Sequence, residues 1–282
     1  MSNPTYQEAL NWAYSHIQGK KIDVTAPEFI LSQRHGWSTT DLLLQRKKTM
    51  QEEEWQLFQS DIARLNQFEP AQYIVGKAPF YGRTFNVSPS VLIPESETEE
   101  LVDWVLTEFQ NDRPLRVLDL GTGSGVIGIS LKLERPNWRV TASDISAAAL
   151  TVAKQNATNL AAEIEFVESN IFNNLLDHQF DLIVTNPPYI AVDETAQMDP
   201  QVIQYEPQLA LFADQQGMGF YQQMMTQIDS VLNVNGHLFG ETGYKQESLI
   251  TELIKNKNRN AKFETRHDIS GKMRMFHAWM LS

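Results

Sequence analysis

From Leu115 onward, the chain alternates short β-favouring runs with longer helical segments, and this alternation constrains the fold more than any other feature. Short apolar runs with β-branched side chains are typical of buried strands, and the segments between them have helical periodicity. This order predicts an α/β domain with an open, largely parallel sheet that carries helices on both faces. We expect strands at 116–120, 139–143, 164–168, 181–185, 236–241, 263–267 and 275–280, and helices at 126–134, 147–159, 218–232 and 246–255.

The first part of the chain has a different texture and predicts a separate small helical bundle. Over residues 5–68, apolar residues recur at spacings of three and four, which is typical of amphipathic helices. Glycines and prolines then separate short β-favouring runs at 73–76, 80–85 and 91–94, which favours a hairpin linker, and a helix is expected over 97–109. We therefore expect a helical substrate-recognition domain over 1–69, a β-hairpin linker over 70–95 and the α/β domain over 96–282.

Composition limits the function classes. The 282 residues suffice for two domains, and no apolar run approaches the roughly 20 residues that span a bilayer. The N-terminal residues lack the basic and apolar regions of a secretory signal, so we expect a cytoplasmic protein without a membrane partner. The chain has no cysteine, and its six histidines show no metal-binding spacing, so we expect no disulfide and no metal site.

The net charge of −12 bears on the choice of partner. A strongly acidic protein repels the phosphate backbone unless its basic side chains gather on one face. The best basic run, residues 46–48, is short and is soon followed by acidic residues 52–54. We expect no stable complex with nucleic acid, and we expect a monomer.

A glycine-rich turn follows the first strand expected in the α/β domain. The turn consists of Gly121, Thr122, Gly123, Ser124 and Gly125, and the expected helix begins directly after it. Glycine permits positive φ and a close approach of the backbone to a ligand, while the first N–H groups of a helix face an anionic group. In such sheets, ligands bind at the carboxyl ends of the strands. The turn therefore predicts a nucleotide-like ligand.

The tetrapeptide Asn186-Pro187-Pro188-Tyr189 follows the strand expected at 181–185. The prolines end the strand and lack backbone N–H groups, so the local backbone accepts hydrogen bonds but hardly donates them. Asn186 adds a side-chain acceptor, and Tyr189 adds a flat aromatic face. This combination suits a planar NH2 group on an amide or a nucleobase. The structural alternative is an ordinary turn that ends a strand.

Residues 123–128 also match Gly-x-Gly-x-x-Gly, the dinucleotide-binding pattern. Three features favour S-adenosylmethionine instead: Asp119 within the strand end, a first glycine as early as Gly121, and the acceptor-rich tetrapeptide at a later strand. An NAD-linked oxidoreductase or a nucleotide-sensing module is the alternative from another class.

Polar residues follow the next two strands as well. Asp144 lies about twenty residues beyond the glycine turn, where a carboxylate can accept both hydroxyls of a ribose. Capping the helix after Ser146 is its alternative role. Asn170 and Ile171 follow the third strand and place an amide and an apolar side chain where we expect an adenine ring.

In this order, the motifs resemble the PrmC (HemK) family of bacterial methyltransferases, which methylate the glutamine of the Gly-Gly-Gln motif in peptide-chain release factors. The resemblance covers nearly the whole chain. It rests on the glycine turn, Asp144, the tetrapeptide, Leu92-Ile93-Pro94 with Glu97-Thr98-Glu99, Tyr205-Glu206-Pro207 with Ala210-Leu211, and Glu241-x-Gly243-Tyr244.

Four residues, at three places in the chain, depart from the usual pattern of the family. Glu95-Ser96 stands in place of Arg-Pro, and this change reverses a charge near the linker. Asn170 replaces an acidic residue near the adenine, although its amide carbonyl can still accept from the adenine amino group. Thr242 replaces a large aliphatic residue before Gly243.

The resemblance implies a Rossmann-like sheet that binds S-adenosylmethionine through the glycine turn, Asp144, Asn170, Ile171 and Asn186. The release factor is the implied protein partner. We assign the two acceptors for the substrate amide to the Asn186 side-chain oxygen and the Pro187 carbonyl, with Pro188 and Tyr189 shaping the slot. An N6-adenine methyltransferase for DNA or RNA, and a glutamine methyltransferase for a ribosomal protein, are the alternatives. The preferred release factor and the docking of the bundle stay open.

Overall fold

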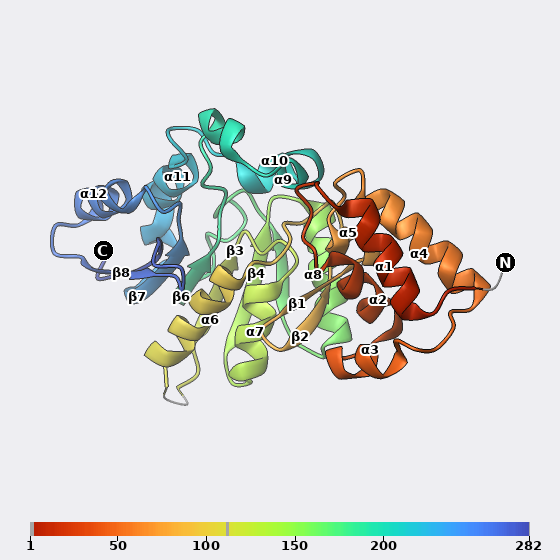
Figure 1. Cartoon of the computed structure of the whole chain (residues 1–282). Coiled ribbons are helices and arrows are strands. Elements are labelled where there is room, and N and C mark those ends of the chain that lie inside the picture. Colours follow the sequence, from red (N-terminus) through yellow and green to blue (C-terminus); the bar gives the residue numbers. More distant parts are fainter. Residues whose placement is uncertain (1–2, 111–112, 282) are drawn as a thin grey trace. The chain divides into compact units, whose positions relative to one another are not determined.

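The computed structural model describes residues 3–110 and 113–281 (Figure 1). The chain divides into two compact units. One reaches up to Lys77 and also takes in Asp199–Tyr205, and the other comprises Ala78–Met198 and the chain from Glu206 onward. None of the helices in the described ranges is long and apolar enough to cross a membrane. The boundaries at 69 and 95 stay predictions.

The N-terminal unit is a helical bundle. Capping boxes begin two of its helices, because Thr5 and Ser38 each exchange hydrogen bonds with the residue three positions on. Leu10, Ile30 and Ile62 are completely buried and belong to one apolar core. The helices are α1 (Tyr6–Ile17), α2 (Ala26–His35), α3 (Thr39–Gln45), α4 (Glu52–Leu65), α5 (Ala71–Val75) and α9 (Pro200–Tyr205).

A hairpin of β1 (Lys77–Phe80) and β2 (Arg83–Asn86) lies within the predicted linker, but it is shorter than the β-favouring runs suggested. Residues 73–75 belong to α5, and residues 91–94 form no strand. Gly76 ends α5 at a φ of 72°, where glycine is not strained. Ile74 packs into the helical core, so its tertiary setting overrides its local β preference.

The larger unit contains the predicted sheet. Its seven strands lie in the order β5-β4-β3-β6-β7-β9-β8. The pairs from β5 to β7 are parallel, whereas β9 is antiparallel to both β7 and β8. The predicted α/β fold with a largely parallel sheet is therefore confirmed. The strands are β3 (Arg116–Leu120), β4 (Arg139–Asp144), β5 (Glu165–Glu168), β6 (Phe180–Thr185), β7 (Leu232–Glu241), β8 (Lys262–His267) and β9 (Met273–Trp279).

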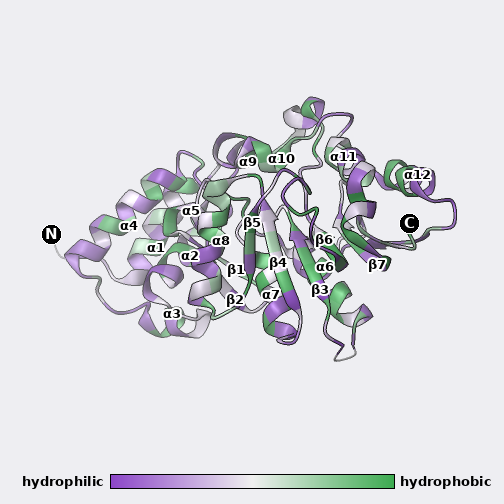
Figure 2. Ribbon diagram, turned by 180° about the vertical axis from the view of Figure 1, so that it is seen from behind, coloured by the Kyte–Doolittle hydropathy of each residue, from purple (hydrophilic) through white to green (hydrophobic). Residues whose placement is uncertain are grey.

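Both faces of this sheet are covered by helices, as predicted. Neighbouring residues of a strand point to opposite faces, so Val117 and Leu118 enter different apolar cores. In Figure 2, hydrophobic and hydrophilic colours both occur along β3 and β4. One core includes α6 (Ser96–Glu108), α7 (Val126–Glu134) and α8 (Ala147–Asn159), and the other includes α11 (Gly219–Gln227) and α12 (Glu247–Lys257). Three short helices complete the unit: η1 (Val192–Gln197), α10 (Gln208–Leu211) and η2 (Ile228–Ser230).

The helix predicted over 218–232 is wrong at its C-terminal end. α11 stops at Gln227, the short helix η2 follows, and β7 already begins at Leu232. The Phe180 N–H of β6 donates to the Val231 carbonyl at 2.7 Å, which draws this part of the chain into the sheet. The apolar residues of this stretch are buried, but Ile228 lies in η2, Val231 follows η2, and Leu232 is the first residue of β7.

Candidate active site

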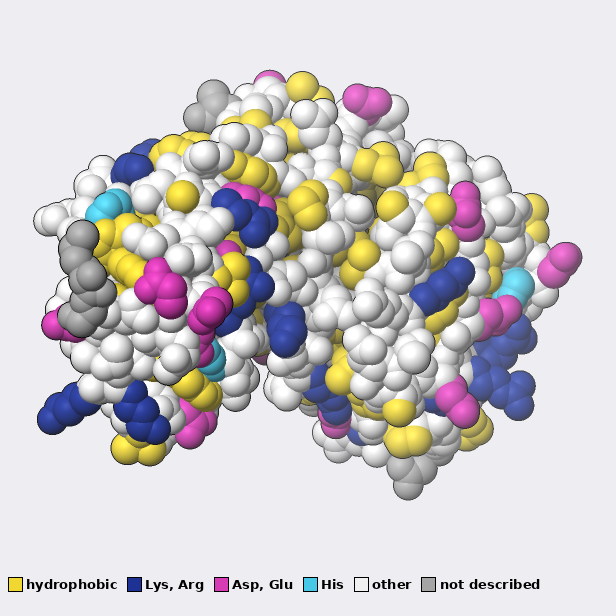
Figure 3. All heavy atoms as spheres, turned by 90° about the vertical axis from the view of Figure 1, so that its right-hand side faces the viewer, with side chains coloured by type: hydrophobic (Ala, Val, Ile, Leu, Met, Phe, Trp, Pro, Cys, Tyr) yellow, Lys and Arg dark blue, Asp and Glu magenta, His cyan; other side chains and the backbone are white. Residues whose placement is uncertain are grey.

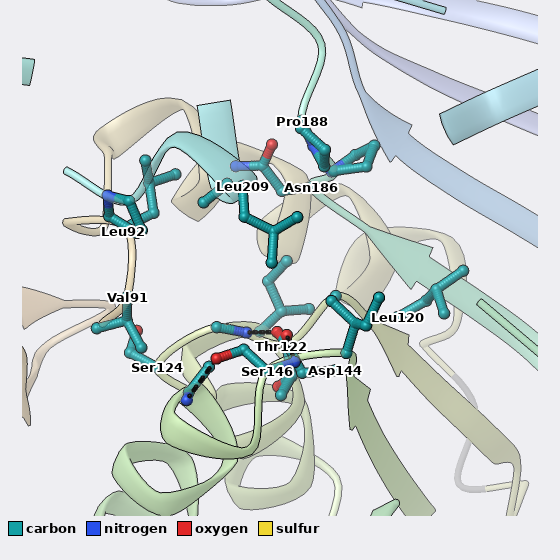
Figure 4. A pocket seen from close by; sticks show the side chains of 18 of the residues that line it. Val91, Leu92, Leu120, Thr122, Ser124, Asp144, Ser146, Asn186, Pro188 and Leu209 are labelled. Carbon is teal, nitrogen blue, oxygen red and sulfur yellow. Dashed lines mark hydrogen bonds between the residues drawn. The ribbon is translucent and has the colours of Figure 1, made fainter. Parts of the chain in front are cut away.

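A pocket opens at the carboxyl ends of the parallel strands β3, β4 and β6, within the larger unit. It contains about 1170 Å³ of space outside protein atoms, part of which is open solvent. In Figure 4, Thr122, Asp144 and Ser146 lie at one end of this space, and Asn186 and Pro188 lie at the other. The cofactor residues predicted from the sequence line this pocket, with the exception of Gly125, and they follow β3, β4, β5 and β6. The lining includes Val91, Leu92, Gly121, Thr122, Gly123, Ser124, Asp144, Ser146, Asn170, Ile171, Asn186, Pro187 and Pro188.

The glycine turn has the backbone geometry that the sequence predicts. Gly121, Gly123 and Gly125 have φ values of 73°, 55° and 87°. A Cβ added at Gly121 or Gly123 would meet nothing within 4 Å, so space beside the backbone is open to a ligand. Gly125 differs, because its Cβ would lie 2.8 Å from Ile129 Cδ1. The first two glycines thus leave room for a ligand, whereas Gly125 permits close packing of the helix.

Asp119 is buried behind this turn and does not line the pocket. Its Oδ2 accepts the Thr122 hydroxyl at 2.5 Å and the Gly128 N–H at 2.8 Å. Burial raises the pKa of Asp119 to about 6, although both hydrogen bonds favour the ionised form. Asp119 therefore holds the turn against the helix that follows it.

Asp144 lies at the end of β4 and joins two segments of the pocket wall. Its Oδ2 accepts the Gly123 N–H and its Oδ1 accepts the Ser146 N–H, both at 2.9 Å. The helix cap itself is Ser146, whose Oγ accepts the Ala149 N–H, so capping is not the role of Asp144. Burial raises the pKa of Asp144, and the backbone hydrogen bonds oppose this rise. A carboxylate oxygen with one donor retains a further lone pair, so it can accept a hydroxyl from a ligand.

Asn170 and Ile171 both line the pocket, after β5. Asn170 is exposed, whereas Ile171 is buried and has a φ of 50°. A positive φ is uncommon for a β-branched residue and marks a position that the surroundings strongly constrain. The Ser169 hydroxyl donates to the Ile171 carbonyl at 2.9 Å and helps to hold this conformation.

The tetrapeptide follows β6, and only part of it lines the pocket. Asn186, Pro187 and Pro188 line the pocket, but Tyr189 does not. The Asn186 Nδ2 donates to Thr98 Oγ1 at 2.9 Å, and the Tyr189 hydroxyl donates to Glu241 Oε1 at 3.0 Å. The role of Tyr189 in shaping a substrate slot stays a prediction.

Two residues of this neighbourhood had no role in the sequence-based interpretation. Glu241 is completely buried at the end of β7, and its Oε2 accepts the Thr98 hydroxyl at 2.7 Å. Burial, with a smaller contribution from Glu95, raises the pKa of Glu241 to about 7. Thr98 and Glu241 both occur in the motifs quoted above. They are 143 positions apart in the sequence, so no local spacing connects them.

Glu206 is another residue to which the sequence motifs assigned no role. Its Oε2 accepts the Ile93 N–H at 3.2 Å and so holds the 91–95 segment that lines the pocket. Burial raises the pKa of Glu206 to about 7. Across the two described ranges, no group of three or more His, Asp or Glu side chains is arranged to hold a metal ion.

Comparison with known protein families gives two matches along the chain. Residues 8–76 match the PrmC N-terminal domain, and residues 100–205 match the methyltransferase small domain.

Curated relatives match over most of their length. A release factor glutamine methyltransferase of Enterococcus faecalis is 42% identical over 270 residues, which cover 96% of this chain and 97% of the relative. Its counterpart in Lactococcus lactis is 44% identical, with 88% and 91% covered, and the one in Bacillus subtilis is 36% identical, with 96% of each covered.

Solved structures show the same fold at lower identity. A methyltransferase from Pyrococcus furiosus matches with a TM-score of 0.53 and 15% identity, over 79% of this chain and 97% of that chain. The 16S rRNA N2 G1207 methyltransferase of Thermus thermophilus, solved with AdoMet and guanosine, matches with a TM-score of 0.52 and 19% identity, over 72% and 49%.

Proposed function

Since this chain belongs to the release factor glutamine methyltransferase family, we propose that it methylates the glutamine side-chain amide in the Gly-Gly-Gln motif of peptide-chain release factors. One observation carries the proposal. The Asn186 NH2 group donates to Thr98 Oγ1, so the amide is left with its carbonyl oxygen as a free acceptor. This acceptor lies in the same pocket as the glycine turn and Asp144.

The residues at the other end of the pocket fit S-adenosylmethionine. When bound, this cofactor supplies a methyl group carried on a positively charged sulfur atom. The open space beside Gly121 and Gly123 admits a ligand against the backbone, and Asp144 offers carboxylate lone pairs to ribose hydroxyls. Ile171 gives an apolar surface for a flat ring, and the Asn170 carbonyl can accept from an amino group.

The tetrapeptide residues act on the substrate amide. An amide nitrogen is a weak nucleophile because its lone pair is delocalised into the carbonyl group. Acceptors on both of its N–H bonds return electron density to the nitrogen, and we assign them to Asn186 Oδ1 and the Pro187 carbonyl. Holding the amide in line for transfer can contribute ~7–11 kcal/mol to lowering the barrier. No covalent intermediate with a side chain of the protein is required.

The charge of the chain supports a protein substrate over a nucleic acid. A net charge of −12 opposes binding to phosphates. On the face shown in Figure 3, Lys and Arg side chains occur in several separate groups, interspersed with Asp and Glu. Because release factors act on ribosomes, we place the reaction in the cytoplasm. The monomeric state stays a prediction.

The proposal is tested by incubating the protein with methyl-labelled S-adenosylmethionine and a purified release factor, followed by peptide mapping. We expect the label on the glutamine of the Gly-Gly-Gln motif, and no label on a release factor in which this glutamine is replaced by glutamate. Parallel incubations with adenine-containing DNA and with ribosomal proteins test the alternatives. Label on either of them, with none on the release factor, would overturn the proposal.

A further inference from the structure

We infer that Thr98 and Glu241 form a hydrogen-bond relay that positions Asn186, so that its carbonyl oxygen and not its NH2 group is free for the substrate. This inference rests on the proposed function. The relay joins three elements: Glu241 ends β7, Thr98 lies in the first turn of α6, and Asn186 follows β6. Thr98 Oγ1 donates to Glu241 Oε2 at 2.7 Å and accepts from Asn186 Nδ2 at 2.9 Å.

The direction of the relay follows from counting protons. A threonine hydroxyl has one proton to donate, and an ionised carboxylate can only accept. While Glu241 is ionised, the Thr98 proton must point toward Glu241, and the Thr98 oxygen can then only accept. Turning the Asn186 amide over would place its oxygen against the Thr98 oxygen, with no proton between them. The buried carboxylate therefore selects one of the two amide orientations.

The same carboxylate also holds the other end of the tetrapeptide. Its Oε1 accepts the Tyr189 hydroxyl at 3.0 Å. Glu241 is itself fixed, because its backbone carbonyl accepts the Tyr221 hydroxyl at 2.6 Å and its strand pairs with β9 opposite Met275. Glu241, with 0% of its surface exposed, thus acts as a positioning residue for Asn186 and Tyr189 without lining the pocket.

The charged and titratable groups that act on Glu241 come from four segments around it. They are Glu95 before α6, Arg274 on β9, Tyr189 after β6 and Tyr221 on α11. Burial and Glu95 raise the pKa of Glu241 to about 7, while Thr98, Tyr189 and Arg274 act in the opposite direction.

Protonation of Glu241 would undo the selection. A protonated carboxyl group carries an O–H donor and can donate to Thr98, which frees the Thr98 proton to face Asn186. Either orientation of the Asn186 amide then has a partner, and the acceptor is no longer enforced. We expect kcat to fall as pH decreases through the titration of Glu241. Glu95→Gln removes a repelling charge, so it should move this acid limb to lower pH.

The test compares Thr98→Val with Thr98→Ser. Valine has nearly the shape of threonine but cannot pass on a hydrogen bond, whereas serine keeps the hydroxyl. We expect Thr98→Val to lower kcat for release factor methylation about ten-fold or more at pH 8, with the Kd for S-adenosylhomocysteine nearly unchanged. Thr98→Ser should recover most of kcat. A wild-type kcat and pH profile in Thr98→Val would overturn the inference.

Glu241→Gln provides the second variant. Glutamine does not titrate, so its kcat should be low and the acid limb assigned to Glu241 should disappear. Glu163→Gln makes the same change in charge at an exposed position and should keep the wild-type profile. An unchanged acid limb in Glu241→Gln would also overturn the inference.

A measurement without substrate separates this inference from the proposed function. The Glu241 carboxyl can be followed by ¹³C NMR in protein labelled at glutamate, with its resonance assigned by its loss in Glu241→Gln. Thr98→Val removes a donor to the carboxylate, so the Glu241 titration should move to higher pH. An unmoved titration refutes the relay even if glutamine is methylated. A moved titration supports the relay even if the release factor is not the substrate.

Discussion

The Asp144 carboxylate and the Gly123 backbone are joined by a hydrogen bond of 2.9 Å between Oδ2 and the N–H group. This bond connects the end of β4 to the glycine turn after β3, two strands that are neighbours in the sheet. Asp144 therefore shapes the turn while it offers its remaining lone pairs to the pocket. A ligand that contacts both segments therefore depends on Asp144 in two ways, as a direct hydrogen-bond acceptor and as the residue that shapes the glycine turn.

Asp144→Ala should weaken cofactor binding. The variant loses the acceptor for ribose hydroxyls and the tie to the glycine turn, so we expect the affinity for S-adenosylhomocysteine to fall about 10–100-fold. Isothermal titration calorimetry measures this directly. Glu168→Ala, at the paired position on the neighbouring strand β5 but outside the pocket lining, is the matched control. An unchanged affinity in Asp144→Ala would remove this residue from the cofactor site.

Asn186→Ala should lose catalysis more than cofactor binding. The change removes the acceptor that we assign to the substrate amide, and the loss of one such group typically lowers kcat by about 100-fold or more. The affinity for S-adenosylhomocysteine should fall much less. Steady-state methylation of a release factor and calorimetry give the two quantities. Methylation at the wild-type rate would show that the acceptor lies elsewhere.

Gly125→Ala should mainly reduce the stability of the protein, whereas Gly121→Ala should mainly reduce its affinity for the cofactor. At Gly125, a Cβ would lie 2.8 Å from Ile129 Cδ1 and 3.2 Å from Ala153 Cβ, at a φ of 87°. We expect Gly125→Ala to lower the free energy of unfolding by about 2–4 kcal/mol in urea titrations.

At Gly121 the space is open and only the positive φ is unfavourable, so Gly121→Ala should cost about 1 kcal/mol of stability. Its methyl group enters the pocket instead, and cofactor affinity should fall. Equal loss of stability in the two variants would contradict the packing role of Gly125.

Glu206→Gln should stabilise the protein in a pH-dependent manner. Burial raises the pKa of Glu206 from 4.5 to about 7, so the folded state disfavours its ionised form. The wild-type carboxyl group is therefore most favourable below pH 4.5, and its contribution to stability is lost as pH rises toward 7. Glutamine does not titrate and can still accept the Ile93 N–H.

We expect Glu206→Gln to be more stable than the wild type by about 1–2 kcal/mol at pH 8, allowing for partial exposure of the side chain. The difference should shrink as pH falls through 7. Urea unfolding at pH 8 and pH 5 checks the sign, and a difference that grows at pH 5 would be the contrary result.

The parts of the fold that could be predicted from sequence are those in which local preference and tertiary setting agree. β3, α7 and α8 have the predicted bounds. The glycine turn marks the end of β3 and the beginning of α7, and Ser146 caps the beginning of α8. The runs at 73–76 and 228–232 could not be assigned from local preference. The first packs mainly as a helix in an apolar bundle, and the second passes from the short helix η2 into β7, where Leu232 pairs with Phe180 of β6.

The sequence by itself determined the glycine turn, the acidic strand end at Asp144 and the tetrapeptide with few backbone donors. Each of these depends on the backbone conformation of adjacent residues, which the chain carries in a short contiguous stretch. Only the tertiary structure decided that Glu241 lies buried against Thr98 and Tyr189, and that Thr98 takes the Asn186 NH2 group. The ionisation of a carboxyl group and the direction of a hydroxyl proton depend on groups that folding brings together from distant positions, so no local pattern reveals them.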